Sequence, residues 1–265
     1  MAAPWKTALV TGASSGIGAA FARLLAGRGV DLVITARDTT RLKALAKELR
    51  DRNGVEVQVL TADLAKKAGV AKVESRLAEP GPEQAPVDLL VNNAGFGSHG
   101  CFWELPVEGE EGQIQVNVLA LVRLTHAALG PMVASGHGAI LNVSSMAGEQ
   151  SVPQNATYGA TKAFVTTFSQ SVHEEAKAAG VSVTALLPGF TRTEFQERAG
   201  YDDARSLPAF VWMEADEVAE QALAAAEAGR SIVVPGTANK VVVAAVGMTP
   251  RSVKRRAVGL LAGRF

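Results

Sequence analysis

The sequence is poor in cysteine, since Cys101 is the only one among its 265 residues. A single thiol excludes an intramolecular disulfide and is typical of proteins in a reducing compartment. Histidine is also scarce, and no histidine has metal-ligand spacing to another or to the cysteine: His99, His126, His137 and His173. We therefore expect no metal site. The N-terminus, MAAPWKTALVTG, enters a candidate strand too early to hold a secretory signal, which predicts a cytoplasmic protein.

Net charge is absent as well, because 26 lysines and arginines balance 26 aspartates and glutamates. We expect no nucleic-acid partner. Residues 239–265 nevertheless hold six basic side chains and no acidic one, so residues 1–238 carry a net charge of −6. This basic, apolar tail is predicted to form a C-terminal helix that covers the core with its charges in solvent. Contact with an anionic membrane surface or with another subunit is the alternative.

Composition and the order of apolar runs predict an α/β fold. Hydrophobic residues make up 48% of the chain and charged residues 20%, without repeats, and we expect a single globular domain over residues 1–265. The predicted strands are 7–11, 31–36, 55–62, 87–95, 138–145, 181–189 and 231–236. The predicted helices are 17–28, 39–52, 64–78, 109–135, the segment carrying Tyr158, and 214–228. This alternation predicts a doubly wound, mainly parallel seven-stranded sheet with helices on both faces.

One connection is irregular: residues 189–212 mix glycine, proline, charge and aromatic side chains without a period. Long ordered insertions in compact domains are often lids over a site, so a substrate lid is predicted here. A mobile solvent loop is the alternative. It is disfavoured by apolar side chains that need a cover: Phe190, Phe195, Phe210 and Trp212.

The first predicted strand ends in TGASSGIG, a glycine-rich turn that opens a helix. Such a turn lets backbone amides approach a pyrophosphate, and the helix N-terminus adds partial positive charge. Packing alone also selects glycine at a strand-to-helix turn, but the position after the first strand of a βαβ unit favours phosphate binding. The candidate cofactor residues are Gly12, Ser14, Ser15, Gly16, Ile17 and Gly18.

The second predicted strand ends in TARD, where a site for NAD commonly has an acid for the ribose 2′-hydroxyl. Here Ala36 is followed by Arg37, whose planar guanidinium suits a 2′-phosphate and so favours NADP. If the register slips by two, Asp38 supplies the missing acid. After the third strand, Asp63 and Leu64 are candidates for the adenine, although Asp63 is equally suited to cap a helix beginning near Leu64.

The remaining strand ends also carry polar or tight-turn residues, in the runs NNAG (92–95), NVSS (142–145) and PGFTRT (188–193). The run YGATK places Tyr158 and Lys162 one helical turn apart on the same face. Taken alone, such a pair is more often a solvated surface pair. Because ligands bind at the carboxyl ends of strands in these sheets, the surrounding strand ends favour a functional pair.

In this order and spacing, TGASSGIG, NNAG, NVSS, YGATK and PGFTRT resemble the short-chain dehydrogenase/reductase family over about residues 5 to 235. The resemblance implies a Rossmann-type sheet and a catalytic group of Asn117, Ser145, Tyr158 and Lys162. Ser145 is preferred to Ser144 because it precedes Tyr158 by 13 residues, the spacing that the family shows. Tyr158 would be the general acid or base, with its pKa lowered by Lys162; Ser145 would orient the substrate oxygen, and Asn117 would support a proton relay.

The resemblance also implies a nicotinamide cofactor, with NADP preferred to NAD. Further contacts would come from Asn93, Ala94, Gly95, Tyr158, Lys162, Pro188, Gly189, Thr191 and Thr193. A wall for a lipophilic ketone, a ketoacyl-type substrate or a secondary alcohol would include Phe96, His99, Phe102 and Trp103. The implied protein is an NADP-dependent oxidoreductase that forms a homodimer or homotetramer. A non-catalytic NADP-binding regulator and an NAD-dependent alcohol dehydrogenase are the alternatives.

Overall fold

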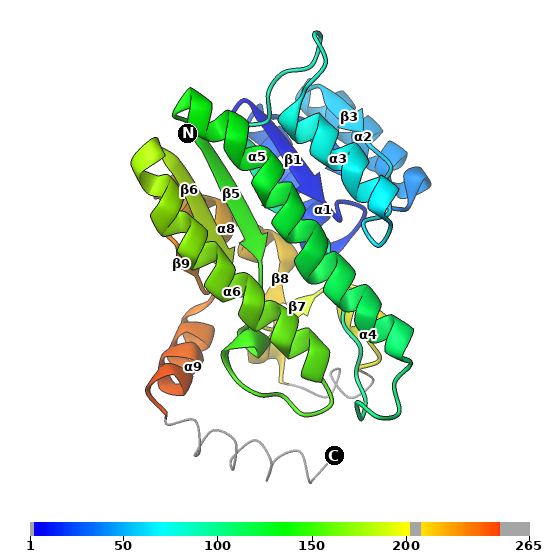
Figure 1. The fold of residues 1–265 in the computed structure, drawn as a ribbon, viewed down its shortest axis with the longest axis vertical. Coiled ribbons are helices and arrows are strands. Elements are labelled where there is room, and N and C mark those ends of the chain that lie inside the picture. Colours follow the sequence, from blue (N-terminus) through cyan, green and yellow to red (C-terminus); the bar gives the residue numbers. More distant parts are fainter. Residues whose placement is uncertain (1–2, 202–207, 250–265) are drawn as a thin grey trace.

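A parallel sheet forms the centre of the molecule (Figure 1). The computed structural model describes residues 3 to 201 and 208 to 249. The sheet consists of β1 (Thr7–Thr11), β2 (Asp31–Thr35), β3 (Val57–Val59), β4 (Leu89–Asn92), β5 (Gly138–Val143), β6 (Val181–Leu186) and β9 (Ile232–Val233). Its order is β3-β2-β1-β4-β5-β6-β9, with every neighbouring pair parallel. The predicted doubly wound, seven-stranded fold is confirmed, and the strand order reverses between β1 and β4, the place where such sheets bind ligands.

Helices cover both faces of this sheet because successive residues of a strand point to opposite sides. One face carries α1 (Gly16–Gly27), α2 (Thr39–Asn53) and α8 (Ala215–Glu227); the other carries α3 (Lys67–Ala78), α5 (Leu121–Ser135) and α6 (Ala156–Ala176). In β1, Ala8 and Val10 are buried in the first core and Leu9 in the second. Burial on both faces is the reason why the strands read as continuous apolar runs.

Two predicted boundaries are wrong near the β3 edge of the sheet. β3 is shorter than the predicted run 55–62, because this edge strand pairs only with β2 among the described strands. α3 begins at Lys67 instead of near Leu64. The backbone first makes a turn in which Lys66 N donates to Asp63 O at 3.0 Å, and Leu64 is buried in the second core.

The helix predicted over 109–135 is one continuous helix with three parts: α4 (Val107–Ile114), a π-helical stretch (Gln115–Ala120) and α5. Its length and composition alone would allow it to cross a membrane, a test that core helices of soluble proteins also pass. Here Leu124, Ala128 and Met132 are buried against α3 and the sheet. One face of the helix therefore packs in the core.

The irregular segment after β6 contains structure that the sequence did not predict. β7 (Thr191–Arg192) pairs with β8 (Met213–Glu214), and α7 (Phe195–Arg198) follows β7. An ion pair of 3.0 Å between Arg192 Nε and Glu214 Oε1 joins the two short strands. Residues 202–207 of the predicted lid lie outside the described residues.

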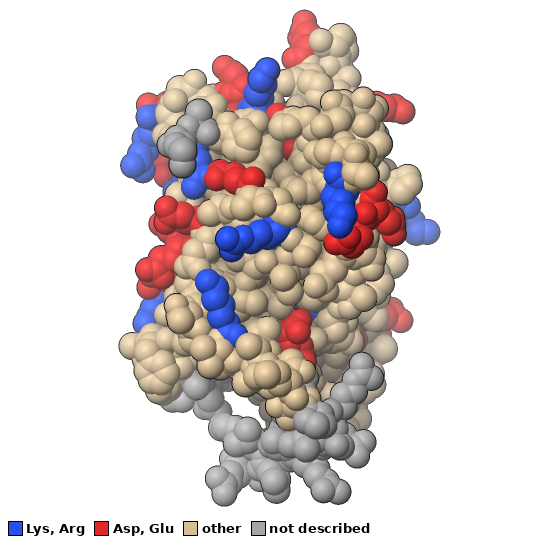
Figure 2. Space-filling model, turned by 90° about the vertical axis from the view of Figure 1, so that its left-hand side faces the viewer, with Lys and Arg blue, Asp and Glu red and all other residues tan. Residues whose placement is uncertain are grey.

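The C-terminal region contains α9 (Thr237–Met248), which lies below the sheet in Figure 1 and contacts the short helix Met146–Glu149 after β5. A helix is therefore present at the start of the predicted tail, but it buries none of its side chains, so the expectation that it covers the core is not met by this part. The rest of the predicted tail, 250–265, lies outside the described residues. On the molecular face shown in Figure 2, acidic and basic side chains are interspersed over the described residues.

Candidate active site

Tyr158 and Lys162 are buried on α6, with 8% and 5% of their surfaces exposed. The ammonium lies 5.6 Å from the centroid of the Tyr158 ring, and Lys162 Nζ donates to Val143 O, at the end of β5, at 2.8 Å. Removing a long charged side chain from water is costly unless it is bonded. The pair is therefore not a solvated surface pair, and it lies at the carboxyl edge of the sheet.

Burial shifts the two side chains toward their neutral forms. It lowers the pKa of Lys162 to about 8. It also raises the pKa of Tyr158 well above its usual value, an effect that a hydrogen bond with Ser145 partly opposes. The protein groups alone therefore do not produce the lowered Tyr158 pKa that we expected from Lys162. Tyr158 is a neutral phenol at physiological pH in this environment.

Neighbouring serines at the end of β5 have separate environments. Ser144 Oγ is buried and donates to Lys162 O at 2.7 Å, with Thr166 Oγ1 at 2.8 Å. Ser145 is partly exposed, and its Oγ accepts a hydrogen bond from Ala147 N at 3.1 Å. Of the two hydroxyls, only that of Ser145 is placed beside the Tyr158 phenol.

Asn117 lies in the π-helical stretch of the long helix and is almost completely buried. Its Oδ1 accepts from Phe96 N at 3.1 Å, and its Nδ2 donates to Phe96 O at 2.9 Å and to Thr161 Oγ1 at 3.2 Å. A π-helical stretch changes which residues face a neighbouring helix, and such stretches are frequent at functional sites. Asn117 thus joins the loop after β4 to α6, within one turn of Tyr158.

The glycine turn after β1 is closely packed against the end of β4. A Cβ atom on Gly18 would lie 2.3 Å from Gly12 O, and Gly12 itself has a φ of +65°. The Asn93 amide supports the turn, since its Nδ2 donates to Thr11 O at 2.9 Å. Packing and left-handed geometry thus both require glycine in this turn.

Several backbone amides at the start of α1 remain available to an anion. The N-cap Ser15 makes no side-chain capping bond, and the first turn of α1 contains no acidic residue. The first amides of a helix have no partner within the helix, so an uncapped start suits a phosphate. Ser14 and Ile17 lie partly exposed in the same turn. The turn therefore fits the pyrophosphate of a dinucleotide.

Arg37 is exposed directly beyond β2, and Asp38 is occupied elsewhere. Asp38 caps α2: its Oδ1 accepts from Arg41 N at 3.0 Å. The carboxylate also lies 3.5 Å from the Arg41 guanidinium. β2 ends at Thr35, so Ala36 and Arg37 are the first residues after it. Arg37 is exposed, and the preference for a ribose 2′-phosphate over a 2′-hydroxyl stays a prediction.

Asp63 and Leu64 follow β3 and do not begin a helix. Asp63 Oδ1 accepts from Ala65 N at 3.0 Å, a local turn bond instead of a cap on α3. Leu64 is buried, and a Cβ on Gly69 would lie 2.1 Å from Asp63 O. Close packing of α3 thus holds this turn, with Asp63 partly exposed at the carboxyl edge.

The cofactor residues predicted after β6 lie against the glycine turn. A Cβ on Gly16 would be 3.1 Å from the Thr193 methyl group, so these two segments touch. Thr193 Oγ1 accepts from Phe195 N at 3.2 Å, and Thr191 Oγ1 donates to Gly189 O at 3.2 Å. Pro188 O accepts from Met146 N at 3.1 Å. The Thr191 and Thr193 hydroxyls, which we expected to bind the cofactor, therefore already form hydrogen bonds within the segment.

The predicted apolar wall is only partly assembled. Phe195 packs on Tyr158 with ring centroids 5.5 Å apart, and His99 packs on Tyr201 at 4.8 Å. Trp103, in contrast, is 81% exposed, and Phe102 is also exposed, so neither lines an enclosed wall. These two predictions fail because the loop turns back at Glu104, whose N–H donates to Cys101 O at 2.9 Å, and leaves both rings in solvent.

Tyr201 and its partner Asn155 are site residues that the sequence reading missed. The Tyr201 hydroxyl hydrogen-bonds Asn155 Oδ1, and Asn155 precedes α6 by one residue. Burial raises the pKa of Tyr201 to about 12. One signal was present in the sequence: the chain has only two tyrosines, and one lies within the predicted lid.

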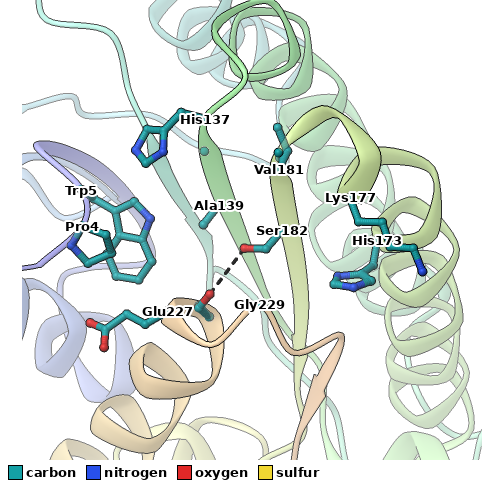
Figure 3. A pocket seen from close by; sticks show the side chains of 13 residues that line it. Pro4, Trp5, His137, Ala139, His173, Lys177, Val181, Ser182, Glu227 and Gly229 are labelled. Carbon is teal, nitrogen blue, oxygen red and sulfur yellow. Dashed lines mark hydrogen bonds between the residues drawn. The ribbon is translucent and has the colours of Figure 1, made fainter.

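A separate cavity of about 380 Å³ lies at the opposite, amino edge of the sheet (Figure 3). It is lined by side chains around the starts of β5 and β6, including Trp5, His137 and His173. His173 Nδ1 is bonded to the backbone of Val183. This cavity is remote from the strand ends described above. Within the described ranges, no group of three His, Cys, Asp or Glu side chains could hold a metal ion, and the absence of a metal site stays a prediction.

The fold and the carboxyl edge together define a nucleotide-binding oxidoreductase with a Rossmann-type sheet. Comparison with known proteins then assigns the family: a family model described as short chain dehydrogenase matches residues 6–204. The chain belongs to the short-chain dehydrogenase/reductase family.

Individual relatives agree with this assignment. A short-chain dehydrogenase from Sphingobium yanoikuyae, solved in complex with NADPH, is 41% identical with a TM-score of 0.83, and the match covers 97% of this chain and 95% of that one. The bulky-bulky ketone specific alcohol dehydrogenase from Comamonas testosteroni is 34% identical with a TM-score of 0.78, over 92% and 93% of the two chains. The very-long-chain 3-oxoacyl-CoA reductase of Bos taurus is 35% identical over 197 residues, 72% of this chain and 62% of that protein.

Proposed function

We propose that this protein is an NADP-dependent reductase of lipophilic ketones, including ketoacyl-type substrates. The observation that carries the proposal is the buried phenol of Tyr158 with Ser145 hydrogen-bonded to it and the Lys162 ammonium beside its ring. The relatives named above add support: one binds NADPH, one is named for bulky ketones, and one is named for a 3-oxoacyl substrate.

The residues of the carboxyl edge fit the cofactor. The glycine turn and the start of α1 would hold the pyrophosphate, Arg37 the 2′-phosphate, Asp63 and Leu64 the adenine, and the segments 93–95 and 188–193 the remaining contacts. When bound, the nicotinamide supplies the hydride for the carbonyl carbon. Lys162, with Tyr158, would contact the nicotinamide ribose.

Tyr158 is the proposed general acid. Because its pKa is raised, the phenol holds its proton at neutral pH and can donate it to the oxygen of a reacting carbonyl. Ser145 would hydrogen-bond the same oxygen and favour the negative charge that develops there. A protonated phenol is the form needed for reduction, whereas oxidation needs the phenolate. The raised pKa of Tyr158 therefore suits the role of a proton donor.

Lys162 and Asn117 support the proton transfer in different ways. Lys162, with a pKa of about 8, carries its charge at pH 7 and would stabilise the phenolate left after Tyr158 has donated its proton. The Asn117 side chain is bonded to Phe96 and Thr161. It therefore holds the loop after β4, and any part in a proton relay would use its backbone. Phe195 and the Tyr201 ring supply apolar surface near Tyr158 for the substrate substituents.

NADPH consumption over a panel of bulky ketones, 3-oxoacyl thioesters and small aldehydes tests this proposal. Tyr158→Phe should lose activity by about 1000-fold, since positioned acids contribute about 100- to 10,000-fold, while still binding NADPH. Ser75→Ala, which removes an exposed hydroxyl from α3, is the control and should keep full activity. Equal rates for wild type and Tyr158→Phe would refute the assignment. Cofactor binding without turnover of any substrate would instead favour a non-catalytic regulator.

The active protein is proposed to be a homodimer or homotetramer. Supporting this, apolar side chains are exposed on the helices that carry Asn117 and Tyr158: Ile114, Leu119 and Phe164. Exposed apolar groups on adjacent helices favour association with a complementary surface. Light scattering of the purified protein measures the mass directly, and a monomer at micromolar concentration would contradict this part of the proposal.

A further inference from the structure

The loop after β4 is held at every second residue from 96 to 100. The backbone of Phe96 is bonded on both sides by Asn117. The side chain of Ser98 is bonded by residues of α4, and Gly100 N donates to Gln154 O at 3.0 Å. Surface loops are usually more mobile than a segment with so many hydrogen bonds to its surroundings. The density of bonds indicates that the position of this loop matters.

The α4 contribution is a buried polar cluster of Ser98, Glu110 and Gln113. Ser98 Oγ donates to Glu110 Oε1 at 2.6 Å, and Gln113 Nε2 donates to the same oxygen and to Ser98 Oγ, each at 2.8 Å. Glu110 is 5% exposed and Gln113 is fully buried. Within the described residues, no lysine, arginine or histidine forms an ion pair with Glu110.

Such a cluster is unfavourable for stability taken alone. A carboxylate taken out of water without a cation is costly, and Gln113 Oε1 is buried without any hydrogen-bond partner. An apolar pair at these two helix positions would hold α4 in the fold without that cost. What the polar pair adds is two hydrogen bonds that fix the position of the Ser98 hydroxyl.

The residues next to Ser98 pack directly on the proposed catalytic group. A Cβ on Gly97 would lie 2.9 Å from the Tyr158 ring, so the loop backbone forms the wall behind the phenol. A Cβ on Gly95 would lie 3.4 Å from Lys162 Nζ and 3.0 Å from Asn117 Oδ1. A displacement of this loop would therefore move the surface against which both reacting side chains rest.

We propose that Glu110 and Gln113 are positioning residues that act through Ser98 to hold the 95–100 loop against Tyr158 and Lys162. This rests on the proposed function, because it concerns the geometry of the same reaction. The cluster touches neither the phenol nor the ammonium; it fixes the wall behind them. Catalysis of this kind is sensitive to placement, and a displacement of about 1 Å can cost about 100-fold in rate.

The test uses Ser98→Ala, Glu110→Gln and the double variant in the full-length protein. Ser98→Ala should lower kcat by about 10- to 100-fold, with a smaller change in the NADPH dissociation constant, since the glycine turn that would hold the pyrophosphate lies elsewhere. Glu110→Gln should lower kcat less, because its amide oxygen still accepts a bond without the added strength of charge. The double variant should be no slower than Ser98→Ala, because Glu110 acts through Ser98. Glu111→Gln, an exposed neighbour on α4, is the matched control and should match wild type.

Hydrogen exchange of the peptide covering 95–100 gives a readout that needs no substrate. Faster exchange there in Ser98→Ala and Glu110→Gln, with the rest of the chain unchanged, supports the positioning role. Unchanged exchange together with wild-type kcat in both variants would overturn it, as would additive losses in the double variant. If wild type reduces no carbonyl, the proposed function fails, and exchange alone then decides whether the cluster holds the loop.

Discussion

The cofactor side and the substrate side of the carboxyl edge are built differently. On the cofactor side, the glycine turn and the residues after β2 continue directly from strands of the central sheet, and backbone packing sets their shape. On the substrate side, the segments around 96–104, 150–155 and 195–201 lie outside that sheet. Hydrogen bonds between side chains or between loop backbones join them to one another, such as Tyr201 to Asn155 and Gly100 to Gln154. The difference indicates that substrate preference can change without disturbing the nucleotide site.

The largest effect is expected from a single methyl group on the cofactor side. Gly18→Ala would place a Cβ 2.3 Å from Gly12 O, a backbone atom that cannot move aside without shifting β1. Overpacking of this kind costs about 3 kcal/mol or more, and NADPH binding should be lost with it. Gly109→Ala, in α4 with open space around it, is the control and should be neutral or stabilising. If Gly18→Ala had the same free energy of unfolding in urea as wild type, the turn would not be tightly packed.

The next effect is expected at Lys162, which lies between the cofactor side and the substrate side. Its contribution to the free energy of unfolding should depend on pH. Its pKa is lowered from 10.5 to about 8, so between these values the unfolded chain binds more protons than the folded one, and stability due to this group rises with pH. Relative to Lys162→Met, wild type should gain on the order of 3 kcal/mol from pH 8 to pH 10.5. Urea unfolding of both proteins across this range measures the difference. The opposing contribution of Tyr158 is present in both proteins and cancels in that difference. Parallel stability curves would contradict the shift.

The same group sets the alkaline limit of the reduction. As pH rises through about 8, Lys162 loses its proton and no longer stabilises the phenolate, so kcat for reduction should fall. Tyr158 itself stays protonated over this range because its pKa is raised. A profile of kcat against pH that stays flat to pH 10 would rule out Lys162 as the titrating group.

A smaller effect is expected at Arg37. Arg37→Ala should weaken NADPH binding by about 10- to 100-fold and leave NADH binding unchanged, because a bond to a charged group contributes about 1.5 to 3 kcal/mol. Arg52→Ala, at the exposed end of α2, is the control. The measurement is the dissociation constant for each cofactor. A loss shared equally by both cofactors would mean that Arg37 does not contact the phosphate.

The smallest effect is expected on the substrate side. Tyr201→Phe keeps the ring on His99 but removes the bond to Asn155. We expect KM for bulky ketones to rise by about fivefold, equivalent to about 1 kcal/mol for one hydrogen bond, with little change for small aldehydes. Equal changes for both substrate classes would place Tyr201 outside the substrate wall.

Prediction from the sequence succeeded where short-range patterns control the structure. The alternation of apolar runs and helices was sufficient for the sheet, and the glycine turn follows β1 as expected. It failed where partners distant in sequence decide. The start of α3 moved to Lys67 because Leu64 is buried in the core, and β7 pairs with β8 across a segment without periodicity. No pattern linked Ser98 to Glu110, since a buried polar residue and an exposed one look alike in a sequence.

The sequence by itself determined the fold class, the family and the residues grouped at the strand ends, because periodicity and turn chemistry are local properties of the chain. The tertiary structure decided the environment of each group. Burial, which depends on the whole fold, makes Tyr158 a neutral phenol and lowers the pKa of Lys162 to about 8. It also separated Ser144, which is bonded inside the core, from Ser145 beside the phenol.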